Sequence, residues 1–320
     1  MAEDISALAK MYGEFARKEA AGRSPLYELL CLEIARYETL LSRLAALPVE
    51  KRQPNLLLAA VKYLFGTVEG WPQFRALVQE RWREIEPIIQ TRRTQTNEPA
   101  RCATLLPVLA SLPQPLALLE VGASAGLCLL PDYYGYRFNG RYVPPTHPGA
   151  AFPVFDCDCN DGVPIPRANV TVAWRMGLDL SPLDVCSNDD ANWLRALVWP
   201  GEGRRAELLE SALQIAKRHS PEIVQGDLRH DLPGLIETVP PGATLVVFHT
   251  AVLAYVASPA DRARFGQTVM DLGARWLSNE GLPDLDDPGL PPRPGGRFSL
   301  ALDGKVLAHT DAHGKSVNWI

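Results

Sequence analysis

Residues 118–127 read Leu-Leu-Glu-Val-Gly-Ala-Ser-Ala-Gly-Leu, and this stretch carries most of the information about the fold. The apolar run over 116–119 predicts a buried parallel strand. It ends in a carboxylate, Glu120, and enters a turn where Gly122 and Gly126 flank Ser124. Residues 127–130 suit the start of a helix. A strand, an acid, a glycine-rich turn and a helix start together let a backbone approach a ligand closely.

Two enzyme classes use such a stretch. Its Glu-x-Gly-x-x-x-Gly pattern resembles the first motif of class I methyltransferases, which depend on S-adenosylmethionine (SAM). Its Gly-x-Ser-x-Gly pattern matches the nucleophile elbow of α/β-hydrolases, for which Ser124, Asp303 and His313 are available in the required chain order. The stretch alone leaves both alternatives open.

The downstream sequence favours the methyltransferase resemblance. Asp179 lies in Gly-Leu-Asp-Leu-Ser-Pro, Asp227 in Ile-Val-Gln-Gly-Asp, and His249 near the end of an apolar run. In that fold, ligands bind at the carboxyl ends of the strands, where these residues are expected. The resemblance implies that Asp179 accepts the ribose hydroxyls, that Asp227 borders the adenine, and that His249 faces the substrate. A helix N-cap is the structural alternative for Asp179.

The predicted fold class is α/β, a Rossmann-like doubly wound sheet with an N-terminal helical domain and a β-hairpin insertion. Apolar stripes at helical spacing in 5–20, 26–47, 55–65 and 73–91 predict helices, which we assign to a helical domain over 1–112. Short apolar runs then alternate with helical patterns, which predicts a parallel sheet and a SAM-binding domain over 113–320. The insertion spans about 131–169 and turns at Asn139-Gly140. Residues 297–302 and the segment after Lys305 predict a terminal antiparallel hairpin.

Over nearly its whole length the chain also resembles a bacterial family of unknown function, numbered 2332. The similarity rests on residues 24–27, 52–57, 95–98, 120–127, 177–184 and 248–249. It gives an architecture and little chemistry. The sequence departs from the methyltransferase pattern where Ser124 replaces the middle glycine, and it carries no motif that marks an acceptor.

Bulk composition excludes several functions. The 320 residues are 47% hydrophobic and 22% charged, as in a folded soluble protein. A formal charge of −5 argues against a nucleic-acid partner. No apolar stretch is long enough for a bilayer, and the N-terminus lacks the features of a signal peptide. The six scattered cysteines have no zinc spacing, so we expect no metal. We expect a cytoplasmic enzyme with a small-molecule substrate; the sequence leaves its oligomeric state open.

Three functions remain open: methyl transfer from SAM to a small molecule; other SAM chemistry, such as cyclisation or aminocarboxypropyl transfer, or SAM binding without turnover; and a serine hydrolase. His249 is the candidate catalytic base, with a structural role as its alternative. Polar residues before the first strand, Gln95, Thr96, Asn97 and Arg101, are candidates to contact the methionine carboxylate; helix capping by Thr96 or Asn97 is the structural alternative. The expected SAM-binding residues are Glu120, Gly122, Ala123, Ser124, Gly126, Asp179, Asp227 and Asn97.

Overall fold

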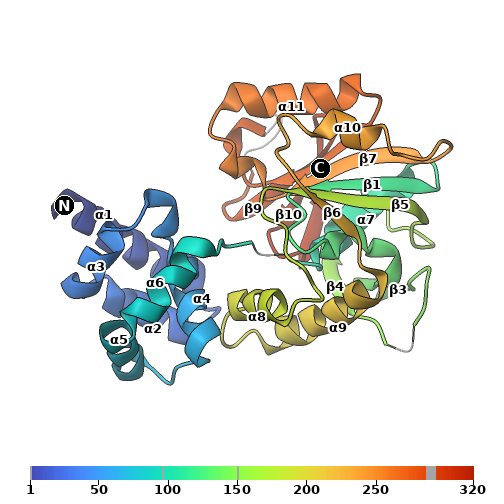
Figure 1. The fold of residues 1–320 in the computed structure, drawn as a ribbon. Helices are drawn as coiled ribbons and strands as arrows, with labels where there is room; N and C mark the ends of the chain where they lie inside the picture. Colours follow the sequence, from blue (N-terminus) through green and yellow to red (C-terminus); the bar gives the residue numbers. More distant parts are fainter. Residues whose placement is uncertain (1, 96, 150, 286–292) are drawn as a thin grey trace. The chain divides into compact units, whose positions relative to one another are not determined.

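The computed structural model describes residues 2–95, 97–149, 151–285 and 293–320 (Figure 1). Contacts divide the chain into two compact units, one of residues 1–96 with 187–207 and one of 97–186 with 208–320. This division differs from a single cut after residue 112. Helix α7 (Arg101–Ser111) packs within the second unit, against its sheet, whereas α8 (Asn188–Leu197) packs on α4 (Pro54–Phe65) in the first.

The first unit is helical, and its helices are shorter than the apolar stripes suggest. Ser24 accepts a hydrogen bond from the Tyr27 N–H, and Pro25 stands at the first helical position, so Ser24 is the N-cap of α2. The stripe over 26–47 is divided before Tyr37, and that over 73–91 at Arg81. Besides α4 and α8, the helices are α1 (Ala2–Phe15), α2 (Pro25–Ile34), α3 (Glu38–Ala45), α5 (Trp71–Glu80) and α6 (Trp82–Thr91).

The second unit is built on a mixed sheet. Among the described residues the sheet has 11 strands in the order β3-β2-β4-β11-β10-β9-β8-β7-β1-β5-β6. Neighbours from β6 to β8 are parallel, whereas β8 to β11 pair antiparallel, so the α/β class and the terminal hairpin are confirmed. The strands are β1 (Leu116–Val121), β2 (Gly135–Phe138), β3 (Arg141–Val143), β4 (Val154–Cys159), β5 (Val172–Asp179), β6 (Glu222–Gln225), β7 (Thr244–Thr250), β8 (Arg275–Glu280), β9 (Arg297–Leu302), β10 (Lys305–Asp311) and β11 (Ser316–Trp319).

The insertion contains the expected hairpin. Asn139 and Gly140 join β2 to β3 with φ of 45° and 86°, the left-handed pair that a two-residue hairpin turn requires. The hairpin continues the sheet, because β2 pairs with β4 and β4 pairs with β11. The helix expected after the glycine turn is reduced to two short 3₁₀ turns (Leu127–Leu129 and Pro131–Tyr133), and this expectation was wrong. Pro131 lacks the N–H that a continuing helix needs.

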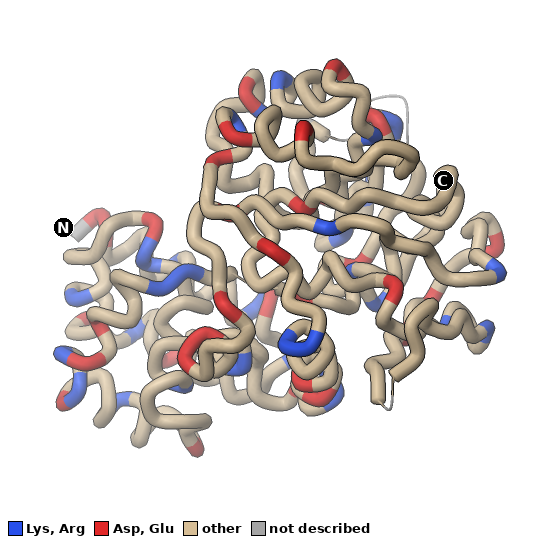
Figure 2. The backbone as a smooth tube through the Cα atoms, turned by 45° about the vertical axis from the view of Figure 1, so that its right-hand side comes forward, with Lys and Arg blue, Asp and Glu red and all other residues tan. Residues whose placement is uncertain are grey.

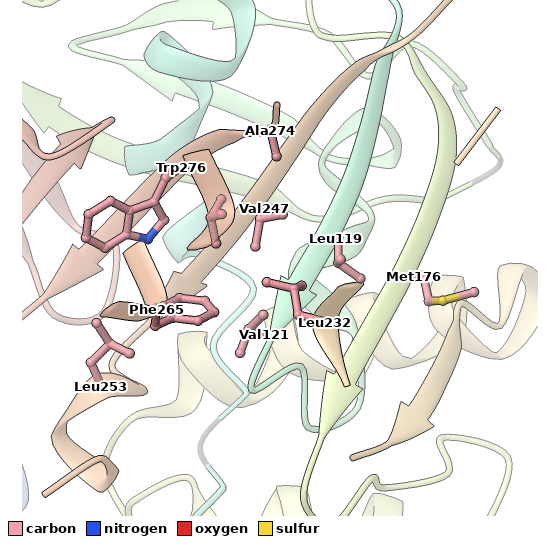
Figure 3. Close-up of a cluster of buried hydrophobic side chains, with 10 residues drawn as sticks. Leu119, Val121, Met176, Leu232, Val247, Leu253, Phe265, Ala274 and Trp276 are labelled. Atoms are coloured by element: carbon pink, nitrogen blue, oxygen red, sulfur yellow. The ribbon is translucent and has the colours of Figure 1, made fainter. Parts of the chain in front are cut away.

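One face of the sheet packs on α10 (Leu232–Ile236) and α11 (Pro259–Asp271) (Figure 3). Leu119 and Val121 of β1, Val247 of β7 and Trp276 of β8 point into this core with Phe265 of α11. Because successive strand residues point to opposite faces, Glu120 points to the other face, which we call the Glu120 face.

Acidic and basic residues are interspersed along the chain (Figure 2). In the part of the chain that the structure describes, no helix has the length and apolarity needed to cross a membrane.

Candidate functional site

The glycine turn joins the end of β1 to the insertion and uses left-handed backbone at Gly122, Ser124 and Gly126, with φ of 72°, 53° and 70°. The N–H groups of Gly122, Ala123, Ser124 and Gly126 bond within the protein. The N–H of Gly122 donates to the Leu178 carbonyl at 2.7 Å, and that of Ser124 donates to Oδ2 of Asp179 at 2.7 Å. N–H groups used in this way are not the open set with which a helix N-terminus binds phosphate.

Asn97 holds the turn at both ends. Its Nδ2 donates to the Ala123 carbonyl at 3.0 Å, and its Oδ1 accepts from the Leu127 N–H at 2.8 Å. The side chain is buried, so the two bonds are shielded from water. Asn97 therefore lies at the turn, and the bonds that it makes there are to the turn itself. Thr96 lies outside the described residues.

Side chains of the protein fill the space beside the glycines. A Cβ on Gly122 would lie 2.4 Å from Cγ2 of Val252, and a Cβ on Gly126 would lie 2.8 Å from Cγ of Pro221. These glycines are required by positive φ and by close packing of the protein on itself. Any ligand at the turn would contact it elsewhere.

Acidic residues lie at the carboxyl ends of three adjacent parallel strands. Glu120 is in β1, Asp179 ends β5, and Asp227 follows β6 by two residues. Asp179 also accepts from the Ser181 N–H at 2.8 Å, so it shapes the loop after its strand rather than capping a helix. Asp227 is paired with Arg229, whose hydrogen bonds are the main reason that the pKa of Asp227 is lowered to about 2.

Glu120 differs from the other two acids because it is 2% exposed. Its Oε2 has no hydrogen-bond partner among the described residues. Burial raises the pKa of Glu120 well above its usual value, and Cys128 and Asp179 add to the increase, whereas Arg101 opposes it. A buried, unpartnered carboxyl oxygen is what a ligand's ammonium or hydroxyl group would complete.

His249 lies on the opposite face of the sheet and is fully buried. Its Nδ1 is 2.7 Å from Oε1 of Glu280, and its Nε2 accepts the indole N–H of Trp276 at 2.9 Å. An indole N–H only donates, so His249 is neutral with its proton on Nδ1. With both nitrogens in use, this geometry favours the structural alternative for His249 over the base.

Glu280 ends β8 and was not anticipated from the sequence. Besides His249, its Oε1 accepts from the N–H groups of Val252 at 2.8 Å and Leu253 at 3.2 Å. It therefore fixes the loop whose Val252 packs on Gly122. The signal for it in the sequence was the polar run Ser278-Asn279-Glu280 after an apolar pair, because β1, β5 and β6 also end in or near an acid.

Two further sets of residues are placed by the structure. Arg175 makes two bonds of 2.8 Å to Asp132, and so anchors the insertion.

Asp303 lies in the β9–β10 turn and His313 lies beyond the other end of β10. At about 3.4 Å per residue, the length of β10 places them roughly 20 Å apart. The hydrolase set of Ser124, Asp303 and His313 is therefore not assembled.

The family model described as an uncharacterized protein conserved in bacteria, domain of unknown function 2332, matches residues 9–319. The match includes both units and every candidate site residue. No curated protein matches the chain. The chain belongs to the bacterial family of domain of unknown function 2332.

Proposed function

We propose that the protein binds SAM at the carboxyl ends of β1, β5 and β6 and transfers its methyl group to a small molecule. One observation carries the proposal: Glu120, Asp179 and Asp227 gather at one sheet edge, around a turn whose N–H groups are bonded to the protein. Such an edge suits a ligand with positive charge and hydroxyls and disfavours phosphates. SAM carries a sulfonium, an ammonium and two ribose hydroxyls.

The strand order supports a methyltransferase-like Rossmann core. From β1 the chain continues to β5 and then β6 on one side, and it crosses to β7 and β8 on the other. The order therefore reverses between β1 and β7, and ligands of open α/β sheets bind in the crevice at such a reversal. The turn at Gly122 and the loop at Val252 form the two sides of this point.

The residues present fit the cofactor. Oε2 of Glu120, buried without a partner, suits the ammonium. A carboxylate accepts several hydrogen bonds, so Asp179 can hold the turn and accept from the ribose hydroxyls as well. Asp227 would border the adenine. When bound, SAM supplies an activated methyl group, so the chain mainly orients the acceptor.

The state of His249 narrows the acceptor. A hydroxyl acceptor needs a base, and both nitrogens of His249 are occupied. The proposed acceptor is therefore a group that can attack the methyl group without first giving a proton to His249. The same observation favours a second candidate, SAM binding with other sulfonium chemistry or without turnover, which product analysis would separate from methyl transfer.

Calorimetric titration with SAM and S-adenosylhomocysteine tests the proposal, with ATP as a phosphate-bearing control. We expect both SAM ligands to bind and ATP to bind much more weakly. Asp227→Asn should weaken SAM, whereas Glu222→Gln, an exposed acid at the opposite end of β6, should leave it unchanged. Absence of SAM binding, or equal binding of ATP, would overturn the proposal.

A further inference from the structure

A buried polar cluster lies on the Glu120 face, at β7 and β8, on the side of β1 opposite to β5 and Asp179. It consists of Glu120, Thr250, Asn279 and Arg101, which are 2%, 7%, 0% and 7% exposed. Thr250 of β7 pairs in register with Asn279 of β8, and both lie two residues beyond the level of Glu120. Because register partners and every second residue along a strand point to the same face, Glu120, Thr250 and Asn279 share this face of the sheet. We call these four residues the Arg101 cluster.

Arg101 joins this cluster from the first turn of α7. Its Nη1 lies 3.2 Å from both the carbonyl and the hydroxyl oxygen of Thr250, and its Nε donates to the Ala312 carbonyl at 2.8 Å. No carboxylate of the described residues forms an ion pair with it. A buried guanidinium that makes no ion pair at contact distance is unusual, because buried charges are normally paired.

The cluster also leaves hydrogen-bonding capacity unused. Oδ1 of Asn279 accepts from the Thr310 hydroxyl at 2.7 Å, whereas its Nδ2 has no partner among the described residues. Oε2 of Glu120 is likewise without one. Buried polar atoms are nearly always paired, and those that are not call for a water, an ion or a ligand. The unpartnered Asn279 amide nitrogen, next to Thr250 and its bound Arg101 guanidinium, indicates a site with a missing occupant.

The chemistry of the occupant follows from the groups that remain. The Arg101 guanidinium and the Asn279 amide nitrogen both donate hydrogen bonds. Donors around a positive charge match a carboxylate. The location differs from the proposed cofactor side, since the glycine turn bonds to β5 while Arg101 bonds to the end of β7 and the loop after β10.

We infer that the Arg101 cluster binds a carboxylate of the acceptor, so that the substrate is a small carboxylic acid. The identification of the bound carboxylic acid as the methyl acceptor rests on the proposed function. The carboxylate site itself can be tested without SAM. Arg101 and Asn279 would anchor the molecule below the β1–β7 crevice. The anchored carboxylate takes no part in bond making.

The test uses acetate as the probe and acetamide as its neutral control, at constant ionic strength on the full-length protein. Saturation-transfer NMR and thermal unfolding should both detect acetate and not acetamide. Asn279→Asp is nearly isosteric and keeps an oxygen for Thr310, but it replaces the amide donor by a carboxyl oxygen. It should weaken acetate by at least about tenfold. Ser278→Ala, the preceding residue on the opposite face of β8, should leave acetate binding unchanged.

Thr250→Val provides a second variant if Asn279→Asp does not fold, and it should also weaken acetate. The inference would be overturned if the wild-type protein did not bind acetate, or if the variants bound acetate as well as the wild type. A crystal structure of the protein grown with acetate that holds only water at the Arg101 cluster would also overturn it. SAM calorimetry on the same samples separates the two proposals. If the protein binds SAM and not acetate, only the proposed substrate class is refuted. If it binds acetate, loses that binding in Asn279→Asp and does not bind SAM, the carboxylate site is supported and the proposed cofactor is refuted.

Discussion

The indole N–H of Trp276 donates to Nε2 of His249 at 2.9 Å, between neighbouring strands β8 and β7. On the other side of the ring, Nδ1 faces Glu280 at 2.7 Å. The two bonds hold the imidazole as one neutral tautomer within the sheet. Since Glu280 also binds the N–H groups of Val252 and Leu253, the set links the end of β7 to the loop beside the glycine turn.

His249→Ala should therefore destabilise the protein. The substitution leaves the Trp276 indole without its acceptor and removes one donor from buried Glu280, which together should lower the free energy of unfolding by about 2 to 4 kcal/mol. Urea unfolding measures the change. His230→Ala, at an exposed histidine, is the matched control and should be near neutral. A His249→Ala protein of wild-type stability that had lost turnover would restore the interpretation of His249 as a base.

Gly122→Ala should destabilise for two separable reasons. The positive φ of 72° costs an alanine roughly 1–2 kcal/mol, and contact with Val252 adds overpacking of about 1–3 kcal/mol. Gly140→Ala is the control for φ alone, because φ is 86° there and an added Cβ would have nothing within 4 Å. Denaturant unfolding should show the larger loss at Gly122, with part of it recovered by Val252→Ala. Equal losses at the two glycines would show that Val252 yields freely.

Local patterns were sufficient to place much of the sheet. The runs over 116–121 and 297–302 correspond to β1 and β9, and Asn139-Gly140 is the hairpin turn between β2 and β3. These signals depend only on residues a few positions apart, so the sequence alone reveals them. The apolar stripes of the helices were less informative about where each helix ends. The same apolar spacing continues from α2 into α3, because both helices bury one face in the same unit, and so the spacing did not reveal the break before Tyr37.

The contacts of the site depend on pairings that sequence alone does not supply. Trp276 and Glu280 lie 27 and 31 residues from His249, and they meet it only because β7 and β8 are adjacent in register. Likewise the glycines at 122 and 126 suggested room for a ligand, whereas Val252 and Pro221 from distant segments fill that room. Motif spacing located the acids at the strand ends, and tertiary packing determined which of their oxygens remain unpaired.

Arg229→Ala should raise the pKa of Asp227. Hydrogen bonds from Arg229 are the first cause of its lowered value of about 2, so their loss should return the carboxyl toward the ordinary aspartate value of about 4. An acid whose pKa is lowered by folding adds stability that is present above its unfolded pKa and is lost as pH falls from about 4 toward 2. NMR titration of the carboxyl carbon measures the shift. An unchanged pKa in Arg229→Ala would assign the lowering to the backbone or to His230.

Glu120→Gln should stabilise the protein at neutral pH. Folding raises the pKa of Glu120, so the folded state holds its proton more tightly than the unfolded state does, and folding is penalised once pH rises above the unfolded value of about 4.3. Glutamine keeps the shape without that penalty.

Urea unfolding across pH 4 to 8 should show Glu120→Gln gaining about 1–3 kcal/mol over wild type at pH 7, with the gain vanishing toward about pH 4. Glu222→Gln, at an exposed acid, should show no such dependence. If the difference in unfolding free energy between Glu120→Gln and the wild type did not change with pH, the pKa of Glu120 would not be raised by folding. With the predicted result, SAM affinity should fall in the same variant, because the oxygen that costs stability is the one proposed to receive the ammonium.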